Sequence, residues 1–272
     1  DGTNKIEAMK ENYKKNNLDC LVVLGGNGSH KTANLLSQEG LNIITLPKTI
    51  DNDLWGTDMT FGFQSAVDIA TRAIDCIHTT AASHGRIFIV EVMGHKTGWI
   101  TLNAGIAGGA DVILIPEIPY DINKITLALK KRYEQKKRFS IIAVAEGAIS
   151  KEDSILDKQE LKKKRKQSPY PSVSYELADI LSKKTGQEVR ITVPGHTQRG
   201  GEPNPYDRVL STRLGAMAAK LIMEGNFGKM VAVKANTLVP VALSETAGKL
   251  KLVPHDCDML NQAKEVGICF GD

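Results

Sequence analysis

Residues 47–53, PKTIDND, place two carboxylates, an amide, a hydroxyl and an ammonium group within a few positions. A surface turn needs one Asn or Asp, so this stretch carries more chemistry than a turn requires. Asp51 and Asp53 are two residues apart, and on an extended segment they face the same way. One carboxylate can then take a proton from an attacking hydroxyl while the other helps to hold Mg²⁺. Lys48 and Thr49 can neutralise and hydrogen-bond a transferring phosphoryl group, and the simpler alternative is an Asx-rich turn.

A glycine-rich stretch, GGNGS, precedes this motif and lies between an apolar run and a helical pattern that starts near Lys31. Glycines let a backbone approach a phosphate closely, and a helix N-terminus supplies free N–H groups and a positive dipole. The stretch lacks the Lys-Ser/Thr ending of a P-loop and is not a G-x-G-x-x-G motif, so alone it is a weak signal. Its residues are candidate donor-phosphate ligands: Gly25, Gly26, Asn27, Gly28 and Ser29.

Apolar strand runs alternate with helical patterns through the first half of the chain, which opens on an amphipathic helical pattern within residues 1–17. Strands are predicted at residues 18–26, 41–47, 86–94, 111–117 and 139–147, and helices at 29–40, 60–84, 99–109 and 122–137. This alternation predicts a mostly parallel sheet with helices on both faces. In such sheets ligands bind at the carboxyl ends of the strands. GGNGS, PKTIDND, EVMGHKTG and AEGA each follow an apolar strand, so we expect them to share that edge.

Length and composition restrict the class of protein. The 272 residues are 42% hydrophobic, which suits one large α/β domain or two smaller ones. A net charge of +4, without basic residues interleaved with aromatics, fits an anionic metabolite better than a nucleic acid. The four cysteines form no C-x-x-C motif and are predicted to be reduced, mostly buried thiols of a cytoplasmic protein. No apolar run reaches membrane-spanning length, and residues 1–17 lack a signal-peptide pattern.

Residues 151–175 interrupt the alternation with a charged segment that contains a basic block at 162–166. A basic block can indicate a nucleic-acid or targeting tract. The composition favours a solvated insertion, which can be helical.

The chain resembles the 6-phosphofructokinase family in motifs that follow the family's order and spacing: GGNGS, PKTIDND, GTDMTFGF, AASHGR, VEVMG, GIAGGADVILIPE and ITVPGHTQRGGEPNPYDR. The resemblance covers nearly all of the chain except the insertion at residues 151–175. It implies two Rossmann-like α/β lobes with mostly parallel sheets and an active site in the cleft between them. Residues 1–62 and 198–252 would form the phosphoryl-donor lobe, and 63–197 and 253–272 the fructose 6-phosphate lobe. The family transfers a terminal phosphate to fructose 6-phosphate, giving fructose 1,6-bisphosphate in glycolysis.

The resemblance also implies roles for individual residues. Asp51 matches the family's catalytic base, Asp53 its partner near the metal, and Thr49 a residue that contacts the transferring group. The family's fructose 6-phosphate contacts match Arg86, Met93, Gly94, Glu146, Arg190, His196 and Arg199. Arginine forks suit a 6-phosphate, and Glu146 can accept sugar hydroxyls. In the family, the residues matching Arg86 and Arg190 reach a neighbouring subunit's site, which implies a homo-oligomer (dimer or tetramer) with shared active sites.

The sequence departs from the family pattern in three places. Many relatives have Asp where Asn27 stands, and Asn keeps an oxygen ligand but loses the charge, so we expect Mg²⁺ binding there to be weakened. His95 replaces an arginine that is common in ATP-using bacterial relatives. The family's first strand, its GG-x-x-x-G phosphate loop and the arginines after it are missing at the front. We therefore expect a fragment or a truncated chain that lacks part of the donor site.

Two residues point to different phosphoryl donors. In the family, Gly at position 28 leaves room for the α-phosphate of ATP, whereas Lys48 is typical of pyrophosphate users. We expect ATP, because backbone room is a necessary condition, and we keep pyrophosphate as the alternative. A catalytically weak regulatory subunit that binds the sugar phosphate is favoured by Asn27 and opposed by intact Asp51 and Asp53. Another GGDG-type kinase, for NAD or a lipid, is disfavoured because PKTIDND occurs together with GHTQRGG.

Overall fold

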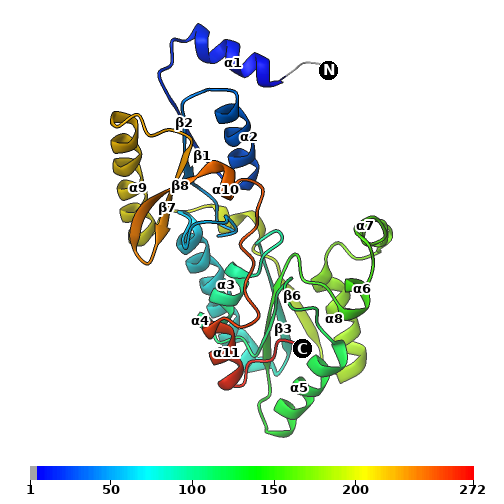
Figure 1. Ribbon diagram of the computed structural model, residues 1–272. Coiled ribbons are helices and arrows are strands. Elements are labelled where there is room, and N and C mark those ends of the chain that lie inside the picture. Colours follow the sequence, from blue (N-terminus) through cyan, green and yellow to red (C-terminus); the bar gives the residue numbers. More distant parts are fainter. Residues whose placement is uncertain (1–4) are drawn as a thin grey trace. The chain divides into compact units, whose positions relative to one another are not determined.

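The computed structural model describes residues 5–272, which form an α/β protein (Figure 1). The chain divides into two compact units. Unit 1 contains the chain up to Gln64 together with Pro203–Lys251, and unit 2 contains Ser65–Glu202 and Leu252–Asp272. The bounds expected from the sequence differ from these by a few residues, and the roles assigned to the two lobes remain predictions.

Unit 1 is built on a four-stranded sheet in the order β1-β2-β7-β8. The strands are β1 (Leu21–Gly25), β2 (Ile43–Pro47), β7 (Lys229–Lys234) and β8 (Thr237–Ala242). β1, β2 and β7 are parallel, whereas β8 returns antiparallel to β7 as a hairpin. The helices are α1 (Lys5–Lys15), α2 (Asn27–Gln38), α9 (Pro205–Met223) and α10 (Leu243–Thr246). Apolar residues of α9 pack on one face of the sheet, and those of α2 and α10 on the other (Figure 1).

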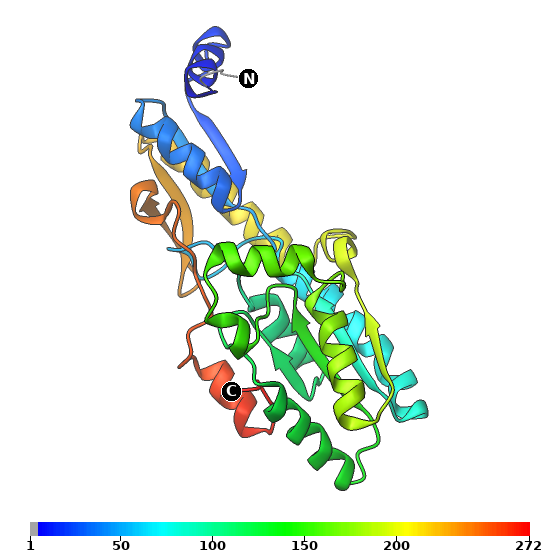
Figure 2. The same cartoon turned by 90° about the vertical axis from the view of Figure 1, so that its right-hand side faces the viewer.

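Unit 2 contains a fully parallel sheet in the order β4-β5-β3-β6. Its strands are β3 (Ile87–Val92), β4 (Val112–Leu114), β5 (Ser140–Ala145) and β6 (Val189–Thr192). Every residue of β3, β4 and β5 is buried, which explains why these strands are apolar except at Glu91 and Ser140. Its helices include α4 (Trp99–Ala107), α5 (Ile122–Glu134), α8 (Val173–Thr185) and α11 (Asp258–Glu265). α5 and α8 lie side by side on one face of the sheet (Figure 2).

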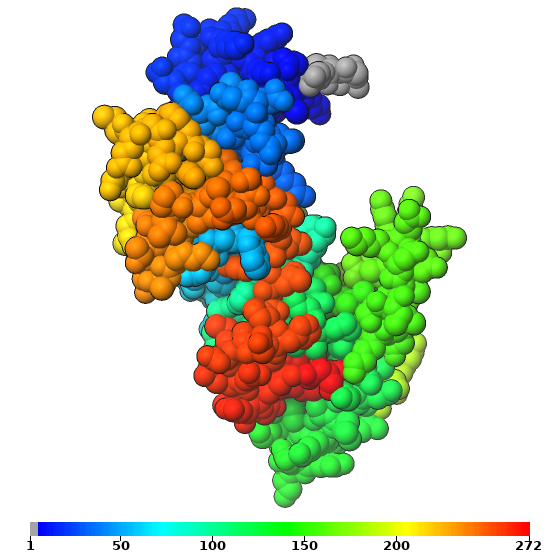
Figure 3. All heavy atoms as spheres, viewed as in Figure 1, coloured from blue at the N-terminus to red at the C-terminus, as the bar shows by residue number. Residues whose placement is uncertain are grey.

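Further helices complete the chain: α3 (Phe63–His84), α6 (Lys151–Ser154), α7 (Lys158–Gln167) and a 3-10 turn, η1 (Gly195–Arg199). α7 carries the basic block of the charged insertion and starts with a capping box, in which Asp157 and Glu160 each accept from the other's backbone amide. No residue of α7 is buried, and its long side chains stand out from the surface of unit 2 (green in Figure 3). The amphipathic pattern within residues 1–17 is confirmed as a helix by α1; residues 1–4 lie outside the described part.

Three expectations from the sequence need correction. Helix α2 begins at Asn27 rather than near Lys31, so most of the glycine-rich stretch belongs to the helix. The segment between Asp51 and Asp53 is not extended, because Asn52 has a left-handed backbone (φ 50°). The cysteines are not mostly buried: Cys76 is exposed and the other three are half-buried, and all four are free thiols within residues 5–272.

The helices were also compared with the requirements of a membrane-spanning segment. Among the helices of residues 5–272, none combines the length and the apolar character that a bilayer crossing needs.

Candidate active site

The glycine-rich stretch forms the junction between β1 and α2. Gly26 is the N-cap residue, has an extended backbone and receives no side-chain cap. The first intrahelical hydrogen bond runs from the His30 amide to the Gly26 carbonyl at 3.1 Å, so the amides of the three preceding residues have no partner inside the helix. A Cβ atom on Gly28 would meet nothing within 4 Å, which leaves the space beside these amides open. Free N–H groups and the helix dipole make this junction suitable for an anion.

Asn27 supplies an oxygen at the same junction. Its Nδ2 donates to the Lys249 carbonyl at 2.9 Å, which orients the side-chain amide. Its Oδ1 is buried and has no hydrogen-bond partner within residues 5–272. A buried acceptor without a partner costs free energy unless a ligand, water or ion satisfies it. Asn27 therefore fits a cation that prefers oxygen ligands.

The PKTIDND loop lies directly beside this junction. The Lys48 amide donates to the Gly25 carbonyl at 3.1 Å, because β1 and β2 are neighbouring parallel strands that end together. A Cβ atom on Gly26 would lie 3.5 Å from the Cβ of Thr49, so Thr49 packs against the glycine-rich stretch. The structure thus brings together the two groups of residues that the sequence placed at strand ends.

Hydrogen bonds hold the loop that contains the two aspartates. The Thr49 hydroxyl accepts from the Asp51 amide at 3.2 Å, and the Thr60 hydroxyl donates to the Thr49 carbonyl at 2.7 Å. Asn52 is buried, and its Oδ1 accepts from the Thr60 amide at 3.0 Å. Asp53 is also buried, whereas Asp51 is partly exposed. The more accessible carboxylate is therefore Asp51.

The expected sugar-phosphate residues of unit 2 fall into two groups. The first group lies at the carboxyl ends of β3 and β5. Glu146 accepts hydrogen bonds from the Gly94 and His95 amides at 3.3 and 2.8 Å. The Met93 amide donates to Oε1 of Gln198 at 3.2 Å, which attaches η1, and with it His196 and Arg199, to the end of β3.

Arg86 and Arg190 form the second group. Arg86 precedes β3, and Arg190 lies on the adjacent strand β6. Both guanidinium groups form ion pairs with Glu188. Arg86 and Met93 stand at opposite ends of β3, roughly 20 Å apart at about 3.3 Å per residue. One chain therefore does not bring Arg86 to the Met93 group, and the expectation that it serves a neighbouring subunit stays a prediction.

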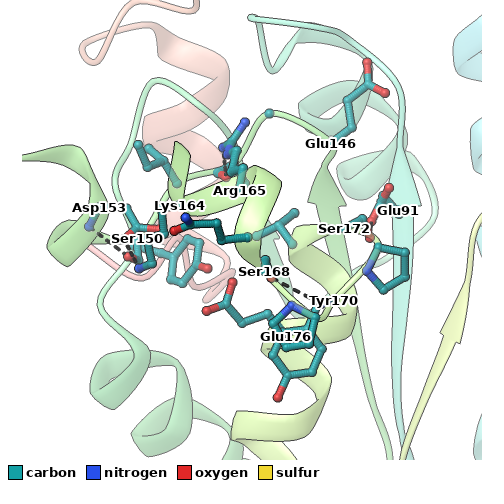
Figure 4. Close-up of a pocket in the computed structure, with 18 of the residues that line it drawn as sticks. Glu91, Glu146, Ser150, Asp153, Lys164, Arg165, Ser168, Tyr170, Ser172 and Glu176 are labelled. Atoms are coloured by element: carbon teal, nitrogen blue, oxygen red, sulfur yellow. Dashed lines mark hydrogen bonds and ion pairs between the residues drawn. The ribbon is translucent and has the colours of Figure 1, made fainter. Parts of the chain in front are cut away.

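A pocket of about 760 Å³ lies within unit 2. Glu146 reaches it from the loop after β5, and Lys164 and Arg165 reach it from α7 (Figure 4). The Arg165 guanidinium donates to the Ala148 carbonyl at 3.3 Å, which ties the insertion to the loop that carries Glu146. The basic block is therefore not only solvated surface, because it forms part of a pocket wall.

No cluster of three or more His, Cys, Asp or Glu side chains in residues 5–272 is arranged to hold a metal ion. Mg²⁺ is often held by one or two carboxylates together with substrate phosphates and water, so such a cluster is not required for it. The acceptor of Asn27 and the buried carboxylate of Asp53 are oxygen ligands of the kind that Mg²⁺ prefers.

The family model described as Phosphofructokinase matches residues 1–222. The chain belongs to the phosphofructokinase family. It is 58% identical over 271 residues to the ATP-dependent 6-phosphofructokinase of Spirochaeta thermophila, covering 100% of this chain and 74% of that protein. It is 48% identical over 286 residues to the ATP-dependent 6-phosphofructokinase of Propionibacterium freudenreichii subsp. shermanii, covering 99% and 77% of the two chains.

Among solved structures, the T-state phosphofructokinase of Pichia pastoris superimposes with a TM-score of 0.77 at 35% identity, over 89% of this chain and 26% of that one. The predicted family and the predicted fold of Rossmann-like α/β units with mostly parallel sheets are therefore confirmed. The role of each site residue is not tested by these similarities.

The sequence analysis did not identify several residues that support this candidate site. Asn52 and Gln198 hold the backbone at the two motifs, and Asp207 accepts from the Gly62 amide at 2.9 Å. We call the PKTIDND segment the aspartate loop. Lys251, near the other end of the chain, donates to the carbonyls of Thr57 and Asp58, which follow this loop. Asn52, Gln198 and Asp207 lie inside the motifs described above, but nothing in the sequence shows that their side chains hold the backbone. Lys251 lies outside these motifs and far from the loop in sequence.

Proposed function

We propose that this chain carries the ATP-dependent 6-phosphofructokinase activity, the transfer of a phosphoryl group from ATP to the 1-hydroxyl of fructose 6-phosphate. The observation that carries the proposal is the hydrogen bond between Lys48 and Gly25, which sets the aspartate loop beside a helix N-terminus suited to phosphates. The names of the relatives that are 58% and 48% identical support ATP as the donor. The product is fructose 1,6-bisphosphate, an intermediate of glycolysis.

Unit 1 would bind the donor. The amides of Asn27, Gly28 and Ser29 would donate to its phosphate oxygens, and Gly25 and Gly26 would let the backbone approach them. The open space at Gly28 would accommodate the α-phosphate of a nucleotide.

The aspartate loop would perform the transfer. Asp51, the more accessible carboxylate, would take the proton from the 1-hydroxyl as its oxygen bonds to the terminal phosphorus. The bond from that phosphorus to the leaving oxygen breaks, and ADP departs while the proton passes to solvent. Lys48 and Thr49 would stabilise the charge on the transferring group. Asp53 and Asn27 would hold Mg²⁺, which neutralises phosphate charge when it is bound.

Unit 2 would bind the sugar phosphate. Glu146 would accept sugar hydroxyls beside Met93 and Gly94, and His196 and Arg199 would bind the 6-phosphate. The separation of Arg86 and Arg190 from this group supports their action in a neighbouring subunit, and hence a homo-oligomer with shared sites.

The test is a titration of ATP and of pyrophosphate against the whole protein with fructose 6-phosphate and Mg²⁺, measuring fructose 1,6-bisphosphate. We expect kcat/KM for ATP to exceed that for pyrophosphate at least tenfold. Pyrophosphate is the second candidate, because the exposed Lys48 stands at the donor junction and could bind a small anionic donor. A preference for pyrophosphate would overturn the donor assignment. Binding of the sugar phosphate without turnover from either donor would identify a regulatory subunit instead.

A further inference from the structure

Lys251 is the last residue of the second segment of unit 1, and it returns to the loop that carries Asp51 and Asp53. Its backbone amide donates to the Asp53 carbonyl at 2.8 Å. The preceding residue, Leu250, forms an antiparallel bridge with Leu54. The segment is therefore attached to the loop by one isolated β-bridge and the adjacent backbone hydrogen bond.

The side chain of Lys251 holds the opposite end of the same loop. Its Nζ donates to the carbonyl of Thr57 at 3.0 Å and to that of Asp58 at 2.8 Å. One residue thus fixes the turn from Asp53 to Asp58 at both ends, through its backbone at one and its ammonium group at the other.

A second polar side chain meets Lys251 at Asp58. The Nδ2 of Asn52 also approaches the Asp58 carbonyl, at 3.4 Å. Asn52 lies between the two aspartates, so a shift of the Asp58 carbonyl would also move Asn52 or break its hydrogen bond. Lys251 and Asn52 are thus coupled through one acceptor.

The geometry around Lys251 requires a hydrogen-bond donor. Two carbonyl oxygens converge on its Nζ, and a side chain without a donor would leave both without this hydrogen bond. Burial lowers the pKa of Lys251 to about 8, while the carboxylates of Asp58 and Asp53 raise it. A purely apolar side chain could fill the volume but could not hold the two carbonyls.

We propose that Lys251 is a positioning residue for phosphoryl transfer: it holds the backbone from Asp53 to Asp58 and, through Asn52, sets the direction in which the Asp51 carboxylate points. This inference rests on the proposed function. Lys251 acts through the loop and need not touch either substrate, so it should govern turnover rather than affinity. Displacements of about 1 Å at a reacting group can cost on the order of 100-fold in rate.

The first experiment compares three variants of the whole protein by steady-state kinetics. Lys251→Met keeps the length and loses the donor, and we expect kcat to fall about 10- to 100-fold while both KM values stay within about threefold. Lys251→Arg keeps a cationic donor, and it should recover at least about one third of wild-type kcat. Lys220→Met is the matched control, because Lys220 is an exposed lysine of α9 in the same unit, and it should match wild type.

The second experiment measures the loop itself by amide hydrogen exchange, independently of activity. In Lys251→Met the amides of residues 51–60 should exchange at least tenfold faster, whereas those of β2 and β7 should be unchanged. Unchanged exchange in the loop, or equal acceleration across unit 1, would overturn the inference. If wild type converts no fructose 6-phosphate, the proposed function fails, and the exchange comparison still decides whether Lys251 holds the loop.

Discussion

The side chain of Asn52 binds the backbone of Thr60: its Oδ1 accepts the Thr60 amide at 3.0 Å. Asn52 is 3% exposed and has a left-handed backbone, with φ of 50°. Asn tolerates this conformation better than most residues. The residue between the two aspartates therefore shapes the loop that carries them.

Replacing Asn52 should destabilise the protein by two separable effects. Asn52→Gly removes the hydrogen bonds but accepts the left-handed backbone, and we expect the free energy of unfolding to fall by about 1–3 kcal/mol. Asn52→Ala adds backbone strain, for a further loss of about 1–2 kcal/mol. Denaturant unfolding of both variants measures the difference. Equal stability of the two variants would show that the left-handed backbone costs nothing at this position.

Asp51→Asn should abolish most turnover while leaving the sugar phosphate bound. Loss of a general base lowers kcat by about 10²–10⁴-fold. The isosteric amide keeps the shape of the side chain, so KM for fructose 6-phosphate should stay near that of wild type. Steady-state kinetics tests this, with Asp75→Asn on the exposed side of α3 as the control. A kcat within threefold of wild type would exclude Asp51 as the base.

Arg199→Ala should weaken binding of the sugar phosphate selectively. The guanidinium is exposed on η1, so its removal should not affect folding. A lost hydrogen bond to a charged group costs about 1.5–3 kcal/mol, which corresponds to about a 10- to 150-fold rise in KM for fructose 6-phosphate. KM for the donor should change far less, and Arg72→Ala on α3 should change neither. Equal increases for both substrates would argue against a specific phosphate contact.

Donor choice should depend on Gly28 and Lys48. A Cβ at Gly28 meets no atom within 4 Å, so Gly28→Asp should fold normally and act only on the donor. Its carboxylate would occupy the place of an α-phosphate and repel it, so activity with ATP should fall much more than any activity with pyrophosphate. Lys48→Gly should reduce pyrophosphate use most, because that donor has no adenosine contacts to compensate. A donor ratio unchanged by Gly28→Asp contradicts the steric explanation.

Acid should destabilise the protein through His30. This residue of α2 is 1% exposed, and burial lowers its pKa below the usual 6.5, although its Nδ1 contacts the Gly26 carbonyl at 3.0 Å. Below pH 6.5 the unfolded chain therefore binds more protons than the folded one, and the unfolding free energy falls with pH by at most about 1.4 kcal/mol per unit.

The measurement for His30 is denaturant unfolding between pH 7.5 and 5. His30→Asn keeps a donor near the Gly26 carbonyl but cannot titrate, so its stability should fall less with decreasing pH than that of wild type. His84→Asn, at an exposed position of α3, should retain the wild-type dependence. Parallel curves for wild type and His30→Asn would rule out this source of acid sensitivity.

Some strands could be predicted from the sequence because their own residues are enough to identify them. β3, β4 and β5 are buried at every position, so nearly continuous apolar runs indicated them. The edge strand β6 carries mixed polar and apolar residues that are mostly half-buried, and its strand character depends on its neighbours. The start of α2 was misplaced because Gly26 caps the helix without a side chain, which leaves no capping residue to read.

The supporting contacts of the site could not be predicted, because they join distant parts of the chain. Lys251 and Thr57 are 194 residues apart, and Met93 and Gln198 are 105 apart. Glu146 was recognisable because it directly follows β5, and Asp51 because it lies in the loop after β2. Nothing in the local pattern distinguishes Lys251 from the many lysines on the surface.

The order of strands in unit 1 has a consequence for synthesis on the ribosome. β2 is buried at all five positions and pairs with β1 on one side, but its other neighbour, β7, is made roughly 180 residues later. At about 5–20 residues per second, some 9–36 s pass before β7 emerges. During that time the nascent chain presents an apolar strand with one unpaired edge, which can pair with other chains. The first half of unit 1 must therefore wait, in a state open to aggregation, until β7 has been translated.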